Sequence, residues 1–387
     1  MSIYVKDLFQ LDTFKNFKVV AGERGLNRRI AAAQVLDFEF VDGLQSQRKI
    51  MFDRDSFVIS SLLFARDNKT VLVKAIKTLA DLNISAFAYK NVIYQNLPQE
   101  ILDFADSKNL PILEFQDEDA YFEDIIFAIM DQVKQDSRIQ LMEEQIKKLL
   151  KQELSKEEIE AVVESMNPDL QNKNQAFYLE IGDERKTIKL LMAFTPSEKL
   201  KRKSIISKYG KDLLIILSTD KEESNLQHKL EDALFYLGIK KDDLKIGQSR
   251  VHAGKGNIKM AIEEAIHSRI VGQIEGKKVI NYEEIGAYQM LLPEIKSEHL
   301  QKYMQNYLHP ILNDGEGQSE LIKTAVQYVL AGGDLNQASE RLFCHKNTVR
   351  YRVNKIHELI DINSNEMEFF EHLATAIRIY LINGLVH

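Results

Sequence analysis

The residues best suited to chemistry in this chain form a basic, polar stretch near its C-terminus. Four cations fall within ten positions, and residues 344–357 contain no acidic side chain, although the whole chain carries a formal charge of −7. At about 100° per helical residue, the cations and their polar neighbours share one face and aliphatic residues share the other. A short basic helix of this kind fits the major groove of DNA. The candidate DNA-binding residues are Lys346, Asn347, Thr348, Arg350, Tyr351, Arg352, Asn354 and Lys355.

The two kinds of side chain on this face suit two kinds of contact. The cations would neutralise phosphates and set the register of the protein on the duplex. They are Lys346, Arg350, Arg352 and Lys355. Asparagine can bond bidentately to adenine, and an arginine can instead contact guanine. The candidates for base edges are Asn347, Thr348, Tyr351 and Asn354.

The elements that must position this face are a companion helix and a tight turn. Asn336 is the expected N-cap of the companion helix, since its side-chain oxygen can accept an orphaned backbone N–H. Leu335 and Leu342 bracket that helix, and the small Ser339 leaves room for the second helix. The turn is predicted at Phe343–His345, and the basic helix begins directly after it. Its buried stripe is predicted to be Val349, Val353, Ile356 and Ile360.

Spacing and charge alone leave two interpretations equal: a DNA-binding helix and a basic helix that only faces solvent. Residues 332–360, above all the run HKNTVRYRV at 345–353, resemble the C-terminal helix-turn-helix of the PucR/CdaR family of bacterial transcription regulators. The family pattern has arginine, asparagine and serine where this chain has Lys346, Asp334 and Asn336. The resemblance implies sequence-specific binding to double-stranded promoter or operator DNA. Because a helix-turn-helix usually binds two half-sites, we expect a homodimer or a higher homo-oligomer.

Composition bounds the rest of the chain. Its 387 residues exceed one ordinary core, so about two to four domains are expected. An apolar fraction of 44% and a charged fraction of 28% are typical of a soluble globular protein. The single cysteine, Cys344, excludes an internal disulfide and fits a reducing compartment. The N-terminus lacks the layout of a secretory signal, and the longest apolar run, Phe57–Ala65, is too short to cross a membrane, so a cytoplasmic protein is expected.

Residues 1–134 alternate strand-like and helix-like segments, which is typical of an α/β domain with a parallel sheet. The predicted strands are Ala31–Leu36, Phe57–Ser61, Ser85–Tyr89 and Pro111–Glu114. The predicted helices are Thr70–Leu82, Gln99–Ser107 and Tyr121–Val133. The region resembles the family's N-terminal regulatory domain in the segments Val5–Leu8, Val20–Arg28 and Leu110–Leu113. That resemblance implies a sensor domain for a small-molecule effector.

One loop of this domain departs from the family. Where the family has an acidic residue, an apolar pair, two threonines and a glycine, this chain has FVISSL at 57–62. The hydroxyls persist and the glycine is lost, which argues against an inherited effector-binding role for the loop. The acidic stretch Gln116–Asp124 shows no converging partner ligands, so a solvated loop and an acidic helix start are favoured over a metal site.

Residues 135–170 are expected to form a helical linker. Apolar residues at heptad spacing form a short seam, which is too short for a self-standing coiled coil but could pair across a dimer. They are Ile139, Met142, Ile146 and Leu149. Ser155 and Glu158 predict a capping box that opens a second helix, Lys156–Met166.

Residues 171–292 are predicted to form a second α/β unit. Its predicted strands are Ala176–Ile181, Lys211–Ser218 and Lys278–Asn281, and its predicted helices are Leu226–Leu237 and Ile258–Val271. The unit resembles the family's middle domain, a degenerate GGDEF-like relative of the diguanylate cyclase fold. The segments that carry this resemblance are Lys245–Gly247, Ala261–Ala265 and Val279–Gly286.

The candidate hairpin of this unit, Ser207–Asp212, carries lysines where a cyclase needs carboxylates to hold Mg²⁺. We therefore expect a scaffold or dimerisation role, with no catalytic residue, no cofactor and no metal site, and not an enzyme. The loop His252–Gly256 lacks the spacing of a Walker loop and is interpreted as the connection into the next helix. A nucleotide-binding or nucleotide-processing protein acting through this unit is the alternative.

Residues 293–387 are predicted to form an all-α C-terminal domain. The helix Ser319–Ala331 backs the helix-turn-helix, Gly332 and Gly333 end it, and the helix Glu366–Ile382 closes the domain or pairs two copies. The expected fold is thus a multidomain α/β and α+β protein: an α/β sensor, a GGDEF-like α/β unit and an all-α helix-turn-helix domain. The resemblance implies a transcriptional regulator, with activation as the expected direction, that responds to a metabolite of nitrogen, purine or amino-acid metabolism.

Overall fold

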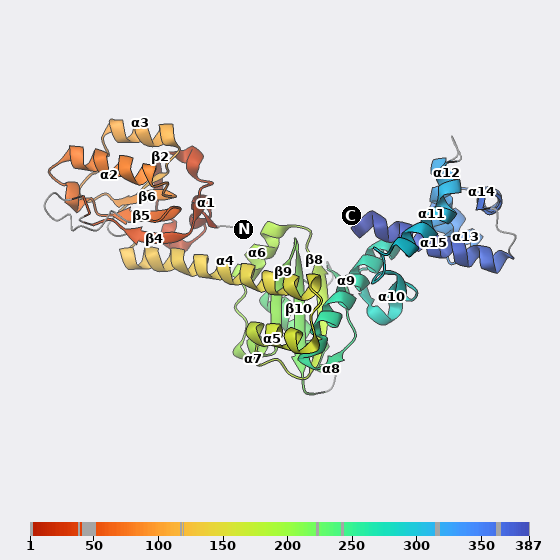
Figure 1. The fold of residues 1–387 in the computed structure, drawn as a ribbon. Coiled ribbons are helices and arrows are strands. Elements are labelled where there is room, and N and C mark those ends of the chain that lie inside the picture. Colours follow the sequence, from red (N-terminus) through yellow and green to blue (C-terminus); the bar gives the residue numbers. More distant parts are fainter. Residues whose placement is uncertain are drawn as a thin grey trace. The chain divides into compact units, whose positions relative to one another are not determined.

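The computed structural model describes residues 3–37, 39–40, 52–116, 118, 120–221, 224–240, 244–313, 318–360 and 365–386. The chain divides into two compact units, Met1–Met142 and Glu143–His387 (Figure 1). Residues 117 and 119 of the predicted acidic stretch lie outside the described residues. Within the described part of the chain, no helix is long and apolar enough to cross a membrane.

The first unit is built on a five-stranded sheet in the order β2-β7-β6-β5-β4. The strands are β2 (Lys18–Ala21), β4 (Ala32–Val35), β5 (Ser56–Ser60), β6 (Ala86–Lys90) and β7 (Ile112–Phe115). Strands β4 to β7 pair in parallel, which confirms the predicted topology. The antiparallel edge strand β2 was not predicted. A separate small ladder joins β1 (Ile3–Tyr4) to β3 (Arg29–Ile30).

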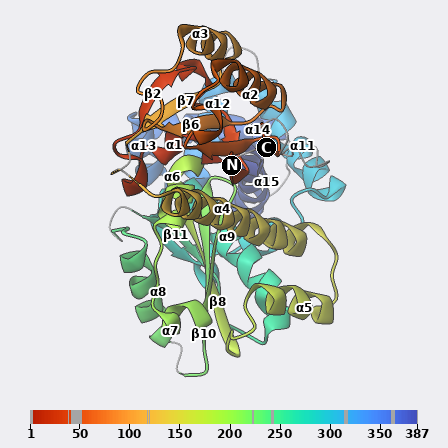
Figure 2. The ribbon, with the colours of Figure 1, turned by 90° about the vertical axis from the view of Figure 1, so that its left-hand side faces the viewer.

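Two different layers cover this sheet. The helices α2 (Lys69–Asp81) and α3 (Gln99–Lys108) lie together over one face (Figure 2) and bury apolar residues that recur with the helical period. Both helices were predicted within two residues of these bounds. On the other face aromatic rings meet: Phe14 lies edge-on to Phe57 with centroids 5.8 Å apart. Phe17 stacks on Phe115 at 4.6 Å.

The loop after β5 keeps a backbone conformation that suits the missing glycine. Leu62 has a φ of 59°, in the left-handed region, and its side chain is fully buried. The hydroxyl of Ser60 accepts a hydrogen bond from the Leu62 N–H at 3.0 Å, and that of Ser61 accepts one from the Leu63 N–H at 3.3 Å. The two hydroxyls therefore shape the turn, while Leu62 anchors it at a backbone cost of about 1–2 kcal/mol.

The sequence predicts a helix that ends at Val133 and a separate linker helix after it. That prediction was wrong, because the structure has one continuous helix, α4 (Phe122–Lys151). Its sequence contains neither glycine nor proline, so nothing interrupts the backbone hydrogen-bond ladder. Half of the predicted seam, Ile146 and Leu149, is fully buried in the second unit. These two residues of the predicted seam therefore pack within their own chain.

The next helix, α5 (Lys156–Met166), begins and ends at the predicted residues. Its predicted capping box is confirmed. The Ser155 hydroxyl accepts from the Glu158 N–H at 3.2 Å, and the Glu158 carboxylate accepts from the Ser155 N–H at 2.8 Å. Two otherwise orphaned backbone donors at the start of α5 are thereby satisfied.

The sheet of the second unit runs in the order β13-β11-β8-β10-β9, with β12 also paired to β8. The strands are β8 (Lys173–Glu180), β9 (Ser204–Tyr209), β10 (Asp212–Thr219), β11 (Lys245–Gln248), β12 (His252–Ala253) and β13 (Val279–Asn281). The helices are α6 (Glu184–Met192), α7 (Glu198–Arg202), α8 (Ser224–Tyr236) and α9 (Ile258–Glu275). Every strand and helix predicted for this region is present, and the strands β9, β11 and β12 and the helices α6 and α7 are additional.

Helices α8 and α9 pack on this sheet in different ways. Leu226 and Leu230 of α8 share one apolar cluster with strand residues such as Ile215. Helix α9 packs against β8 and β11 at very short range. A Cβ atom at Gly247 would lie 2.2 Å from the carbonyl oxygen of Ala265, so only glycine allows α9 to approach β11 this closely.

The predicted hairpin in this unit is confirmed as the connection between β9 and β10. Tyr209 pairs with Asp212 across its end. Gly210 occupies the turn with a φ of +62°, a conformation that glycine adopts without strain. The turn therefore consists of Gly210 and Lys211.

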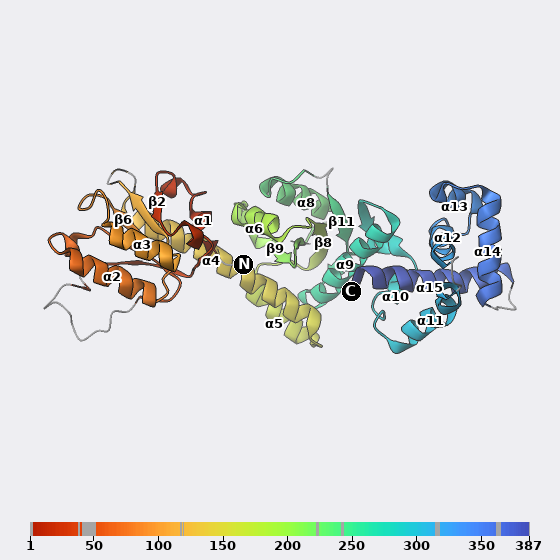
Figure 3. The same cartoon turned by 90° about the horizontal axis from the view of Figure 1, so that it is seen from above.

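The C-terminal part is helical, as predicted. Its helices are α10 (Tyr288–Leu291), α11 (Glu298–Leu312), α12 (Gln318–Leu330), α13 (Leu335–Leu342), α14 (Lys346–Ile360) and α15 (Glu366–Val386). Helix α15 runs alongside α11 (Figure 3). Gly332 and Gly333 follow α12 with φ values of +63° and +87°, which confirms their predicted role as its end. Tyr282 and Ile382 belong to one apolar cluster, so packing continues across the predicted boundary at residue 292.

Candidate nucleic-acid interface

The helix-turn-helix begins with α13, which is capped by Asp334 and not by Asn336. The Asp334 carboxylate accepts from the N–H groups of Asn336 at 2.7 Å and Gln337 at 3.3 Å. The predicted cap was wrong because the helix begins at Leu335, where an ionised carboxylate best satisfies the free N–H groups at the positive end of the helix dipole. These backbone hydrogen bonds lower the pKa of Asp334 from its ordinary value.

The turn and the second helix lie where the sequence predicts them. Phe343 closes α13 in the left-handed conformation, with a φ of 53°, and its side chain is 96% exposed. His345 then caps α14: its ring Nδ1 accepts from the Asn347 N–H at 3.2 Å, and its carbonyl accepts from the Thr348 N–H at 2.9 Å. No role was predicted for His345, although its place directly before Lys346 is the signal that could have indicated one.

The face of α14 that is turned to the core is aliphatic, as predicted. Val349 and Ile356 are fully buried, Val353 is nearly so, and Ile360 at the end of the helix is half-buried. These residues share a core with Leu321 of α12 and with α15. Burial of this stripe fixes the rotation of α14 and thereby decides which side chains face outward.

The small residue of α13 that is fully buried in the core of this domain is Ala338. Ser339, which was predicted to leave room for the second helix, is half-buried, and its hydroxyl donates to the Asn336 carbonyl at 2.7 Å. A hydroxyl that bonds to its own helix in this way gains little by facing another helix. The small residue that is buried therefore lies one position before the one predicted.

The opposite face of α14 is open to solvent. Its exposed side chains are Asn347, Arg350, Tyr351 and Asn354, and its half-exposed side chains are Lys346, Thr348 and Lys355. The Tyr351 side chain is 69% exposed, which is unusual for a residue with an aromatic ring. Amides, one hydroxyl, a phenol and cations thus gather on one accessible face, where they can contact base edges and phosphates.

Arg352 is the exception among the predicted contact residues. Its side chain is only 23% exposed, and its Nη2 lies 3.0 Å from the Glu320 carboxylate. Its Nη1 also lies 3.5 Å from the hydroxyl of Thr324. Both partners belong to α12, so the structure places Arg352 in the contact between α12 and α14.

The lysine-bearing hairpin of the second unit shows a different arrangement. The Lys208 ammonium is buried, with Glu143 of α4 at 2.7 Å and Glu184 of α6 at 2.8 Å. Glu143 also accepts from the Gly210 N–H at 2.9 Å and lies 3.0 Å from the Lys147 ammonium. The charge of Lys208 is therefore neutralised by side chains of the same chain.

The pKa values of this cluster follow from its pairing. Burial alone would raise the pKa of Glu143, but hydrogen bonds from Lys208 and Lys147 lower it below its ordinary value. Burial alone would lower the pKa of Lys208, but hydrogen bonds to its two carboxylate partners raise it. Both groups therefore keep their charges at neutral pH.

The glycine-rich loop between β12 and α9 forms the predicted connection. The Lys255 ammonium donates to the Glu164 carboxylate at 2.5 Å and to the Pro168 carbonyl at 2.7 Å.

The Glu264 carboxylate is buried nearby in the sequence, on α9. It accepts from the Arg250 guanidinium and from His252 Nε2 at 2.9 Å. Burial would raise the pKa of Glu264, but these hydrogen bonds lower it to about 2. Nowhere in the described residues do three His, Cys, Asp or Glu side chains gather in a way that could hold a metal ion.

Comparison with known proteins assigns both ends of the chain. Residues 7–133 match the purine catabolism regulatory protein-like family, PucR. Residues 321–379 match the PucR C-terminal helix-turn-helix domain, so α13 and α14 form the helix-turn-helix of a known type of DNA-binding domain. The two matches place a regulatory-family domain at one end of the described chain and a helix-turn-helix domain at the other, as the sequence predicts.

Individual relatives are similar over shorter stretches. The chain is 30% identical to the proline-responsive transcriptional activator PutR of Bacillus subtilis over 135 residues, which make up 34% of this chain and 31% of PutR. It is 38% identical to an uncharacterised protein of Haemophilus influenzae over 72 residues, which make up 19% of this chain and 18% of that protein. The chain thus spans less than a third of the length of either relative. The crystal structure of a regulator of polyketide synthase expression from Bifidobacterium adolescentis is 15% identical, with 62% of this chain and 97% of that chain covered and a TM-score of 0.30.

Proposed function

We propose that this chain is a sequence-specific transcriptional regulator that contacts its operator through the exposed face of α14. The observation that carries the proposal is the division of α14 into a buried aliphatic face and an accessible polar face. Arg350 and Tyr351, which lie on the accessible face, have large side chains that are exposed to solvent. In a chain with a net charge of −7, this face concentrates positive potential where a DNA backbone can approach.

Within this interface the residues have different roles. Lys346, Arg350 and Lys355 contact phosphates and set the register on the duplex. Arg352 orients α14 through its ion pair with Glu320 and contributes less to the DNA contact. The base edges are contacted by Asn347, Thr348, Tyr351 and Asn354, which alternate with the phosphate-binding cations along the exposed side of α14.

The remaining parts of the chain are proposed to regulate this interface. Residues 1–134 sense an effector, residues 135–170 connect, residues 171–292 form a GGDEF-like scaffold and residues 293–387 bind DNA. The internal neutralisation of Lys208 by Glu143 and Glu184 supports a scaffold role for the middle part. Two copies of the chain bind two half-sites of the operator as a homodimer or higher homo-oligomer.

The proposed effector is a small metabolite of nitrogen, purine or amino-acid metabolism. The match of residues 7–133 to a purine catabolism regulatory family supports this class. The similarity to a proline-responsive activator supports it too, and it also supports activation as the direction of regulation.

The test is the capture of sheared host DNA by the purified full-length protein at moderate salt, followed by sequencing. We expect enrichment of a few promoters that share an inverted or direct repeat, since two half-sites are bound. Enrichment without a common sequence that disappears when salt is added would reflect phosphate attraction alone and would contradict sequence-specific regulation.

A further inference from the structure

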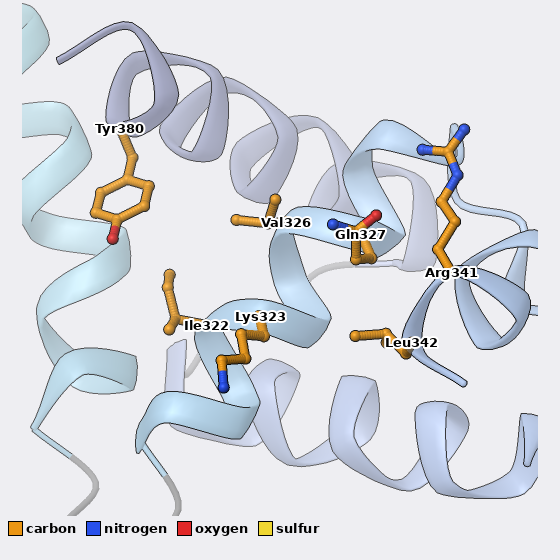
Figure 4. Close-up of a pocket in the computed structure, with 7 residues that line it drawn as sticks. All are labelled: Ile322, Lys323, Val326, Gln327, Arg341, Leu342 and Tyr380. Carbon is orange, nitrogen blue, oxygen red and sulfur yellow. The ribbon is translucent and has the colours of Figure 1, made fainter. Parts of the chain in front are cut away.

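The helices that hold α14 in place also form an open groove with a volume of about 280 Å³. Apolar side chains from three helices line it. Ile322 and Val326 come from α12, Leu342 comes from α13, and the Tyr380 ring comes from α15. Tyr380 lies at one end of the groove and Leu342 at the other, with α12 between them (Figure 4). The groove is therefore elongated across three helices of the domain.

Two cations stand at the borders of this groove, and none of its lining residues is acidic. Lys323 is 62% exposed and lies 3.5 Å from the Glu320 carboxylate. Arg341 is exposed, and no ion pair links it to another described residue. An apolar surface bordered by cations is complementary to an apolar segment that carries acidic side chains on its flanks.

The direction of the two cations decides between occupants of different size. In Figure 4 the Lys323 ammonium and the Arg341 guanidinium point away from each other, on different sides of the groove. They do not converge on one point, as they would around a single small carboxylate or phosphate. A helix has room for about two or three apolar anchors in the groove and for carboxylates on both of its flanks.

We propose that this groove binds an acidic amphipathic helix of a partner protein. Ile322, Val326 and Leu342 receive the apolar side chains of that helix, and Lys323 and Arg341 pair with its carboxylates. No residue of α14 lines the groove, so a partner seated there leaves the DNA-binding face of α14 accessible. That last point rests on the proposed function; the binding of the helix does not.

The test uses the full-length protein and two fluorescent peptides of about five helical turns. One peptide has leucines along one face and glutamates elsewhere, and the other has lysines in place of the glutamates. Binding is measured by fluorescence anisotropy for the wild-type protein and for the double variant Lys323→Glu/Arg341→Glu. The matched control is Lys302→Glu on α11, because Lys302 is similarly exposed, at 65%, and lies outside the groove.

We expect the acidic peptide to bind the wild-type protein and the Lys302→Glu variant, with affinity lowered at least about tenfold in the double variant. The basic peptide should not compete. Equal binding of the acidic peptide to all three proteins, or no binding at all, would overturn the proposal. So would a wild-type dimer that the double variant converts to a monomer without any peptide binding, because the occupant would then be a second copy.

DNA capture by the same proteins separates this proposal from the proposed function. The wild-type protein provides the decisive readout here, because Arg341 lies on α13 of the helix-turn-helix and reversal of its charge would itself repel DNA phosphates. If the wild-type protein binds the acidic peptide but enriches no promoter, the proposed function fails and the groove proposal stands.

Discussion

Two charged regions of this molecule use their side chains in opposite ways. At the hairpin between β9 and β10, Lys208 is buried between Glu143 and Glu184 of the same chain. On α14, Arg350 and its polar neighbours face solvent. A lysine or arginine in the sequence looks the same in both places. The difference teaches that the pairing of a charge, and not its presence, separates a structural contact from a surface available to a partner.

Arg350 and Arg352 provide the sharpest contrast within α14, and Arg350 has the largest expected effect of any single substitution on DNA binding. Arg350→Ala should weaken operator binding at least about tenfold and reduce the salt dependence of the binding constant by about one unit, because a phosphate or base contact is lost. Arg352→Ala should weaken binding much less and lower the melting temperature, since Glu320 loses the nearer of its two cationic partners. Titration at several salt concentrations, with calorimetry of each variant, measures both quantities. Equal effects on DNA binding would contradict the assigned roles.

Glu143→Ala tests the hairpin side of the comparison. The Lys208 ammonium would remain buried with one of its two carboxylate partners removed, which should cost about 3 kcal/mol of the free energy of unfolding. Glu144→Ala, an exposed change on the same helix, is the control and should be close to neutral. Urea unfolding of the two variants gives the difference. A Glu143→Ala variant as stable as the control would show that the cluster is not structural.

Glu264 predicts a pH dependence of stability. Its pKa is about 2 in the folded protein, below the ordinary value of about 4.3. The paired carboxylate therefore contributes about 2–3 kcal/mol above pH 5, and this contribution is lost as the pH falls toward 2. Glu264→Gln should be clearly less stable than the wild-type protein at pH 7. Near pH 3 the difference in stability between the two proteins should become much smaller. A stability difference that is constant from pH 7 to pH 3 would rule out this ion-pair account; exposed Glu283→Gln is the control.

The smallest expected effect concerns the strained turn at Leu62. Both Leu62→Ala and Leu62→Gly lose buried apolar surface, but glycine also relieves a φ of 59°. The Leu62→Gly variant should therefore have a free energy of unfolding about 1 kcal/mol higher than that of the Leu62→Ala variant. At Leu79, buried within α2, the order should reverse by about the same amount. Thermal unfolding of the four variants checks the prediction. It would be refuted if the alanine variant were more stable than the glycine variant at both sites.

Much of the fold was predictable from the sequence because it depends on local patterns. The strands β5 and β6, the capping box at Ser155 and the end of α12 at Gly332 all follow from periodicity or from a residue's own conformational preference. The edge strand β2 and the continuous α4 did not follow as easily. A short edge strand has little periodicity. In α4 the absence of glycine and proline favours a continuous helix, and the predicted end at Val133 did not take this into account.

The candidate site was predictable in its position but not in every role. The buried stripe of α14 fixed its outward face correctly, because helical periodicity alone decides that face. The pairing of Arg352 with Glu320 depends on how α12 packs, so no local pattern could indicate it. The cap at Asp334 was missed by two residues, which is the usual uncertainty at a helix end.

The most direct test of the central claim is the affinity of the full-length protein for its recovered operator, compared with that of the Arg350→Ala/Tyr351→Ala variant. Both side chains are exposed, so the fold of the variant should be unchanged by circular dichroism. We expect specific binding to fall by at least about a hundredfold, to the level of unrelated DNA, because two contacts of about 1–3 kcal/mol each are removed. A folded double variant that retains wild-type affinity for the operator would contradict the account of α14 as the DNA-binding element.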